Sequence, residues 1–182
     1  MKKKRIHRTI LALLLIFVPP FFLVFTEEGN RVSDNVMLWA FGHESMRLNL
    51  KEADHSFTEE SVRKVYPDID WQCGVLQSDF GDEACNAVIG TFNELPASRI
   101  TLFFAHKQLN AIKLDYRRRY HERMVGHVIE TLGQPVNVES ATSGTPDADP
   151  VLQWQTGKGI VVLKKTIAES DQPALLWLGS AQ

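Results

Sequence analysis

Two cysteines are the residues of this sequence whose type and spacing most clearly predict covalent chemistry. Cys73 and Cys85 are the only cysteines among 182 residues. In an oxidising compartment, two cysteines this close are typical of a disulfide. A redox dithiol would favour C-x-x-C, and a zinc site would require further ligands nearby. We therefore predict a structural disulfide. By restricting the unfolded chain, it should raise the free energy of unfolding by about 3 kcal/mol.

Other side chains capable of chemistry are present but lack the spacing of a known site. Asp79, Asp82 and Glu83 offer oxygen ligands for calcium without EF-hand spacing, so we interpret them as solvated turn residues. His121 and His127 are six apart and do not share a helical face, and no H-E-x-x-H or G-x-S-x-G motif occurs. A triad assembled across the fold stays open as an alternative. The sequence predicts no catalytic residue, no metal site and no cofactor.

A basic cluster lies in the stretch LDYRRRYHER, residues 114–123. Arg117, Arg118 and Arg119 stand between Tyr116 and Tyr120. Guanidinium groups offer forked donors and stack on aromatic rings, so they bind anionic head groups or acidic protein surfaces. We interpret these five residues as a candidate partner-binding surface. The alternative is a solvated connection between a strand and a helix.

The distribution of charge separates the first nine residues from the rest. Residues 1–9 contain five basic side chains and no acid, which leaves 15 Lys and Arg against 22 Asp and Glu in the remainder. A nucleic-acid-binding protein needs a positive surface to displace counterions, so the acidic body argues against that class.

The N-terminus has the pattern of an export signal, with a basic head followed by an apolar run from Ile10 to Phe25. No A-x-A-like cleavage site and no lipidation cysteine follows the run. We predict a cytoplasmic tail (1–9) and a retained anchor (10–26) that spans the lipid bilayer of a bacterial inner membrane. The remainder of the chain is then expected to lie in the periplasm. Pro19-Pro20 interrupts this helix. A cleaved signal and a buried core helix are the alternatives.

Residues 27–50 form the predicted juxtamembrane segment. Val32, Val36 and Trp39 fall on one face of a helix that Gly42 would end. The alternative is that this stretch is the first core element of the domain that follows.

Residues 51–182 contain a weak repeat of layout, with units at about 56–117 and 118–182. In the first, Ser56 and Glu59 fit a capping box ahead of a helix that Pro67 ends, and a hairpin is expected around Lys107-Gln108. In the second, a helix over residues 121–132 ends at Gly133, a hairpin turns at 157–159, and residues 173–180 form a last strand. This predicts an α+β domain with helices on one face of an antiparallel sheet.

These units resemble the small extracytoplasmic modules of SmpA/OmlA outer-membrane assembly lipoproteins, in tandem as in the β-lactamase-inhibitor-protein architecture. The matching residues are Leu132–Pro135, Trp154 and Ile160–Leu163, with Val62–Pro67 and Ile100–Leu114 in the first unit. Those lipoproteins carry a lipidated cysteine, and this chain has none in that place. The resemblance implies a protein-binding scaffold.

We therefore expect a non-catalytic, membrane-anchored binding or accessory subunit of an envelope or membrane complex. The alternatives are a small exported hydrolase and, if the signal is cleaved, a secreted inhibitor. A concave pocket with converging polar side chains would favour the hydrolase.

Overall fold

The computed structural model describes residues 42–138 and 150–180. The predicted tail (1–9), the predicted anchor (10–26) and residues 27–41 of the juxtamembrane segment lie outside the described residues. Within the described ranges, no helix has both the length and the apolar character needed to cross a membrane.

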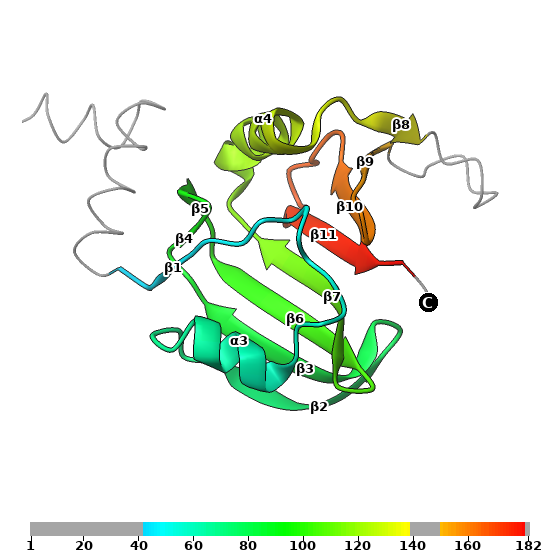
Figure 1. Ribbon diagram of the computed structural model, residues 1–182. Coiled ribbons are helices and arrows are strands. Elements are labelled where there is room, and N and C mark those ends of the chain that lie inside the picture. The colour runs from blue at the N-terminus through cyan, green and yellow to red at the C-terminus, as the bar shows by residue number, and fades with distance from the viewer. Residues whose placement is uncertain (1–41, 139–149, 181–182) are drawn as a thin grey trace, which may run out of the picture. The chain divides into compact units, whose positions relative to one another are not determined.

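Eight strands form one sheet in which every neighbouring pair is antiparallel (Figure 1). In spatial order they are β2 (Gln72–Ser78), β3 (Gly81–Val88), β6 (Arg99–Ala105), β7 (Gln108–Asp115), β11 (Ala174–Gly179), β10 (Gly159–Lys164), β9 (Val151–Gln155) and β8 (Val136–Val138). Three strands of two residues each form a second, small sheet: β1 (Ser45–Met46), β4 (Thr91–Phe92) and β5 (Leu95–Pro96).

The prediction of an α+β domain made of two helix–hairpin units is wrong, because the described part of the chain is mostly β-sheet. Its two α-helices, α3 (Glu59–Val65) and α4 (His121–Leu132), contribute 7 and 12 residues, and a 3-10 turn, η1 (Arg118–Tyr120), precedes α4. The stretch interpreted as a disulfide loop is the strand pair β2–β3. Each unit therefore supplies four strands to the main sheet, whereas the sequence predicts a hairpin in the first unit and a hairpin with one further strand in the second.

The two halves meet at the centre of the sheet. Residues 56–117 supply β2, β3, β6 and β7, and residues 118–180 supply β8 to β11. The last strands of the halves, β7 and β11, pair antiparallel, with Leu114 opposite Leu175 and Ile112 opposite Trp177. The first strands, β2 and β8, are the two edges.

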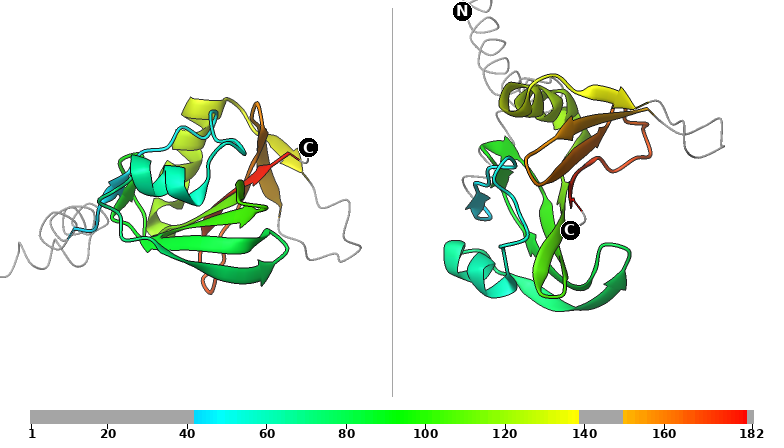
Figure 2. Two further views of the ribbon diagram at one scale, coloured as in Figure 1. Left: turned by 60° about the horizontal axis from the view of Figure 1, so that its bottom comes forward. Right: turned by 45° about the vertical axis from the view of Figure 1, so that its right-hand side comes forward.

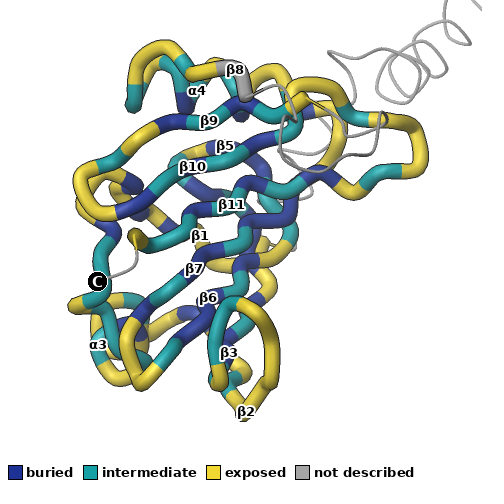
Figure 3. Tube along the Cα trace, turned by 90° about the vertical axis from the view of Figure 1, so that its right-hand side faces the viewer, coloured by how far each residue is buried: buried dark blue, intermediate teal, exposed yellow. Residues whose placement is uncertain are grey.

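The core lies on the face of the sheet that both helices cover (Figure 2). Because side chains alternate along a strand, residues such as Ile112 and Leu114 point to this face. There they join one buried cluster with Val62 of α3 and with Met124 and Val128 of α4. Figure 3 shows this contrast along the chain, with buried residues concentrated in β6 and β7 and exposed ones along β2.

The segment that leads into α3 also belongs to this core. Met46, Leu48 and Leu50 are buried in the same cluster. Residues 43–50 thus agree with the alternative in which this stretch is a core element, and they contain no helix.

The ends of α3 and α4 are fixed by local hydrogen bonds. Thr58 caps α3 in a capping box with Ser61, so the predicted box of Ser56 and Glu59 is wrong. Ser56 instead bonds to the carboxylate of Asp54. The prediction of α4 over residues 121–132 is confirmed, and Gly133 ends it at a φ of 91°, a value that favours glycine.

Each helix end is also held by a buried tryptophan of its own half. The indole N–H of Trp71 donates to the carbonyl oxygen of Tyr66, the C-cap of α3, at 3.3 Å. The indole N–H of Trp154 donates to the carbonyl oxygen of Gly133, the C-cap of α4, at 2.8 Å. The two halves therefore use the same type of contact to fix the helix to the sheet.

Candidate partner-binding surface

The predicted arginine cluster lies on the connection from β7 to α4, at the join between the two halves. Arg117, Arg118 and Arg119 are all exposed. Tyr116 and Tyr120, on either side of them, are only 2% and 1% exposed. The structure thus brings the five predicted residues to one place but divides their roles, because the arginines face solvent and the tyrosines face the interior.

Tyr116 fixes the start of this connection. Its backbone N–H donates to the carbonyl oxygen of Pro173 at 3.2 Å. Its hydroxyl lies 2.8 Å from Nδ1 of His121, and the two rings are stacked at 4°. Burial raises the pKa of Tyr116 well above its ordinary value, so the hydroxyl stays protonated.

Tyr120 fixes the end of the connection. The guanidinium carbons of Arg119 and Arg123 lie 6.0 and 5.9 Å from the centroid of its ring. A cation at this distance from an aromatic face is attracted by the ring quadrupole. These contacts restrict two of the basic side chains, so the cluster presents its charge in a defined arrangement.

A shallow depression of about 590 Å³ opens beside the arginines. Arg117, Arg118 and Arg119 line one side, and residues 170–173 line the other. Asp171, the acid in this lining, pairs with Lys164 at 2.7 Å. That hydrogen bond, together with the nearby charge of Arg118, lowers the pKa of Asp171. The lining of the depression thus contains three arginines and one acid, so its formal charge is positive.

The chemistry that this depression offers is the binding of an anion. Guanidinium groups supply several N–H donors that match the oxygens of carboxylates and phosphates. The hydroxyl of Ser98, which also lines it, donates to the backbone carbonyl of Asp115 at 3.0 Å. That hydroxyl is thus engaged in a structural hydrogen bond.

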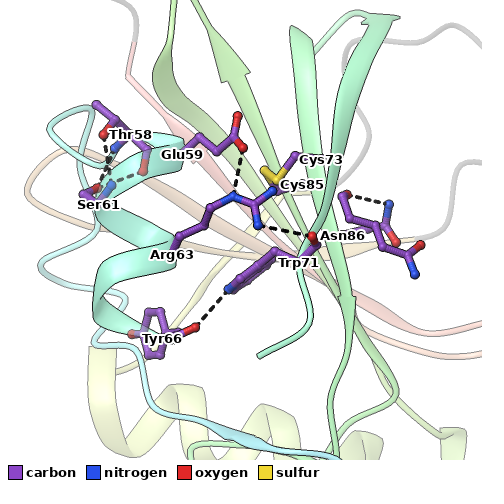
Figure 4. The surroundings of a disulfide bond; sticks show 10 residues. Thr58, Glu59, Ser61, Arg63, Tyr66, Trp71, Cys73, Cys85 and Asn86 are labelled. Atoms are coloured by element: carbon purple, nitrogen blue, oxygen red, sulfur yellow. Dashed lines mark hydrogen bonds and ion pairs between the residues drawn. A yellow bond between two sulfur atoms is a disulfide. The ribbon is translucent and has the colours of Figure 1, made fainter. Parts of the chain in front are cut away.

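The disulfide predicted between Cys73 and Cys85 is present (Figure 4). The two cysteines are direct partners in the β2–β3 register. Glu59 and Arg63 of α3 lie beside them, joined at 3.0 Å, and Arg63 also donates to the carbonyl oxygen of Trp71. The disulfide therefore joins the edge strand β2 to its neighbour β3 beneath α3.

The surroundings of the disulfide do not make a metal site. Within the described residues, Glu59, Cys73 and Cys85 are the one group whose ligand atoms lie close enough to hold an ion. Both sulfurs are bonded to each other, so they are not thiolate ligands. Of the three acids interpreted as turn residues, Asp79 lies in the β2–β3 turn, whereas Asp82 and Glu83 belong to the start of β3.

A second depression, of about 390 Å³, was not anticipated from the sequence. It lies between α4 and the segment before α3, and its lining includes Arg47, Asn93, His127 and Thr131. His127 and Thr131 are one turn apart on α4, which is the only sequence signal for it. The residues that face α4 across this depression come from distant parts of the chain.

Comparison with known proteins gives no relative, because no family model, no curated protein and no solved structure matches this chain.

Proposed function

We propose that this protein is a non-catalytic binding subunit of a bacterial envelope complex, and that the arginine cluster docks an acidic surface of a partner protein. In this proposal, residues 10–26 anchor the chain in the inner membrane and the β-sheet domain lies in the periplasm. The resemblance to outer-membrane assembly modules supports the same class of role.

The observation that carries the proposal is the contrast between Arg117–Arg119 and the body around them. Three consecutive exposed arginines lie in the part of the chain after residue 9, which contains 15 Lys and Arg against 22 Asp and Glu. Buried tyrosines hold both ends of the connection that presents them. Complementary charge steers a partner to this surface and sets the orientation of the complex.

The test is charge reversal on the full chain, followed by quantitative capture from detergent-solubilised membranes. R117E/R118E removes two arginines of the depression and keeps Arg119 on Tyr120. K51E/K64E makes the same change in charge at two exposed lysines elsewhere. We expect R117E/R118E to lose the co-purifying proteins at least tenfold and K51E/K64E to retain them.

Salt provides a second readout on the wild-type chain. Contacts between exposed charges are screened at high ionic strength, so the captured partners should be released as salt is raised. The same set of proteins captured by both double variants, with no dependence on salt, would contradict the proposal.

A further inference from the structure

Strand β2 is an edge of the main sheet that carries little protection between Gln72 and Val75. Among the described residues, β3 is its only neighbouring strand. Val75 is 85% exposed and Leu76 is 45% exposed. Gln72–Ser78 contains no charged residue and no proline, which are two of the features that prevent edge pairing in other proteins. A strand of this kind is a template for another extended chain.

The pairing with β3 shows which backbone groups of β2 face outward. The Cα atoms of Cys73 and Cys85 are 4.0 Å apart, as expected for a narrow pair without mutual hydrogen bonds. Gln72, one residue earlier, accepts a bond from the Asn86 side chain on the β3 side. The N–H and C=O groups of Cys73 therefore point away from β3, and those of Val75 do so by the two-residue period.

The edge is also held in place for pairing. The disulfide fixes Cys73 to β3, and the register is regular from Gln72 to Val75 before it shifts ahead of Ser78. Two residues before Cys73, the outward carbonyl oxygen of Trp71 already accepts a hydrogen bond from the Arg63 side chain. The free outward groups are thus concentrated at Cys73 and Val75.

We propose that a second copy of this chain adds to β2 in antiparallel orientation, with Gly74 opposite Gly74 on the two-fold axis. Cys73 of each copy then faces Val75 of the other, and each such pair exchanges two backbone hydrogen bonds. The two main sheets become one continuous sheet across this seam. An interface of this kind is isologous and closes at two copies.

The outward groups at Cys73 and Val75 lie symmetrically about Gly74, so an identical strand related by a two-fold axis pairs with all of them. Charge permits this pairing, because Gln72–Ser78 contains no charged residue. In the proposed register, Asp70 lies opposite Ser78 and Asp79 lies opposite Ile69. No two like charges face each other from position 69 to position 79.

The test is a cysteine placed at the axis of the full chain, which is then oxidised and run without reductant. A Cβ at position 74 meets nothing within 4 Å, so Gly74→Cys should fold. Opposed cysteines in a narrow pair are close enough to form a disulfide. Gly157→Cys is the matched control, because a Cβ at position 157 also meets open space.

We expect G74C to give a covalent dimer joined from position 74 to position 74, as peptide mapping shows, and G157C to stay monomeric. Adding Val75→Pro removes the outward backbone N–H of position 75, and an edge strand tolerates such a proline. This substitution should lower the dimer yield of G74C to that of G157C. Adding R117E/R118E should leave the yield unchanged, which separates this seam from the arginine surface. The proposal is overturned if G74C dimerises no more than G157C, or if V75P has no effect.

Discussion

The two halves of the sheet share a layout but differ in how they hold it together. Each consists of a helix followed by four strands of the main sheet, and in each a tryptophan indole N–H donates to the carbonyl at the helix C-cap. That bond is 2.8 Å long in the second half and 3.3 Å in the first. The second half also has the longer helix, of 12 residues against 7.

The edges differ in the opposite direction. Edge strand β2 has seven residues and is tied to its neighbour by a disulfide, whereas the described part of the chain gives β8 three residues. The half with the shorter helix and the longer tryptophan bond is therefore the one with the covalent bond. We infer that the disulfide contributes to the stability of the first half what helix packing contributes to the stability of the second.

The largest effect is expected from Trp154, which lies in the core at 2% exposure. W154A should lower the free energy of unfolding by about 3–5 kcal/mol through the cavity that it leaves. W154F keeps most of the ring volume and removes the bond to Gly133, while W71F removes the longer bond to Tyr66. Urea unfolding should show a larger loss for W154F than for W71F, and the reverse order would contradict the comparison.

Removal of the disulfide should have the next largest effect. C73A/C85A frees a short loop in the unfolded chain, which costs about 3 kcal/mol in the loop-entropy estimate. Because the bond ties only the edge strand, amide hydrogen exchange should increase first in β2 and last in β7 and β11. Equal acceleration in both halves would show that the bond supports the whole sheet.

A smaller effect is expected at the start of α3. T58A removes the side-chain acceptor of the capping box and should cost about 1 kcal/mol, whereas T58S should retain most of it. S56A removes the N-cap predicted from the sequence and should lower the free energy of unfolding less than T58A does. Thermal melts of the three variants decide between the two caps.

The smallest effect is a pH dependence of stability that arises where the segment before α3 contacts the second half. Lys158, in the β9–β10 turn, and Ser56 donate to Asp54, and these bonds lower the pKa of Asp54 from 3.8 to about 2. Because the folded pKa lies below the unfolded one, this contribution is present above pH 4 and is lost as the pH falls towards 2.

D54N should therefore be less stable than the wild type at pH 5, with the difference shrinking towards pH 2. D68N removes an exposed acid of the first half and serves as the control. Parallel stability curves for the wild type and D54N across this range would rule out the linkage.

Much of the β-structure could be predicted where one face of a strand is buried. The hairpins of β6–β7 and β9–β10, the last strand β11 and helix α4 are confirmed, because apolar residues recur there with the period of the element. The pair β2–β3 was missed because the edge strand is exposed on both faces and shows no alternation. The fold class was wrong for the same reason.

The candidate surface shows a similar limit. The exposure of Arg117–Arg119 follows from their charge, but nothing in the spacing of Tyr116 and Tyr120 indicates that both rings turn inward. The wrong N-cap has a local cause, since Ser56-x-x-Glu59 and Thr58-x-x-Ser61 have equal spacing and only the structure shows that Asp54 takes the hydroxyl of Ser56.

The central position of β11 has a consequence for biosynthesis. Among the described strands, β11 comes last in chain order, so the edge of β7 that it covers stays unpaired until residues 174–179 have been synthesised. Truncation there would split the sheet in two, whereas loss of β8 would only shorten it. A nascent chain that ends before Ala174 therefore exposes the backbone N–H and C=O groups of β7 that β11 pairs with in the folded protein.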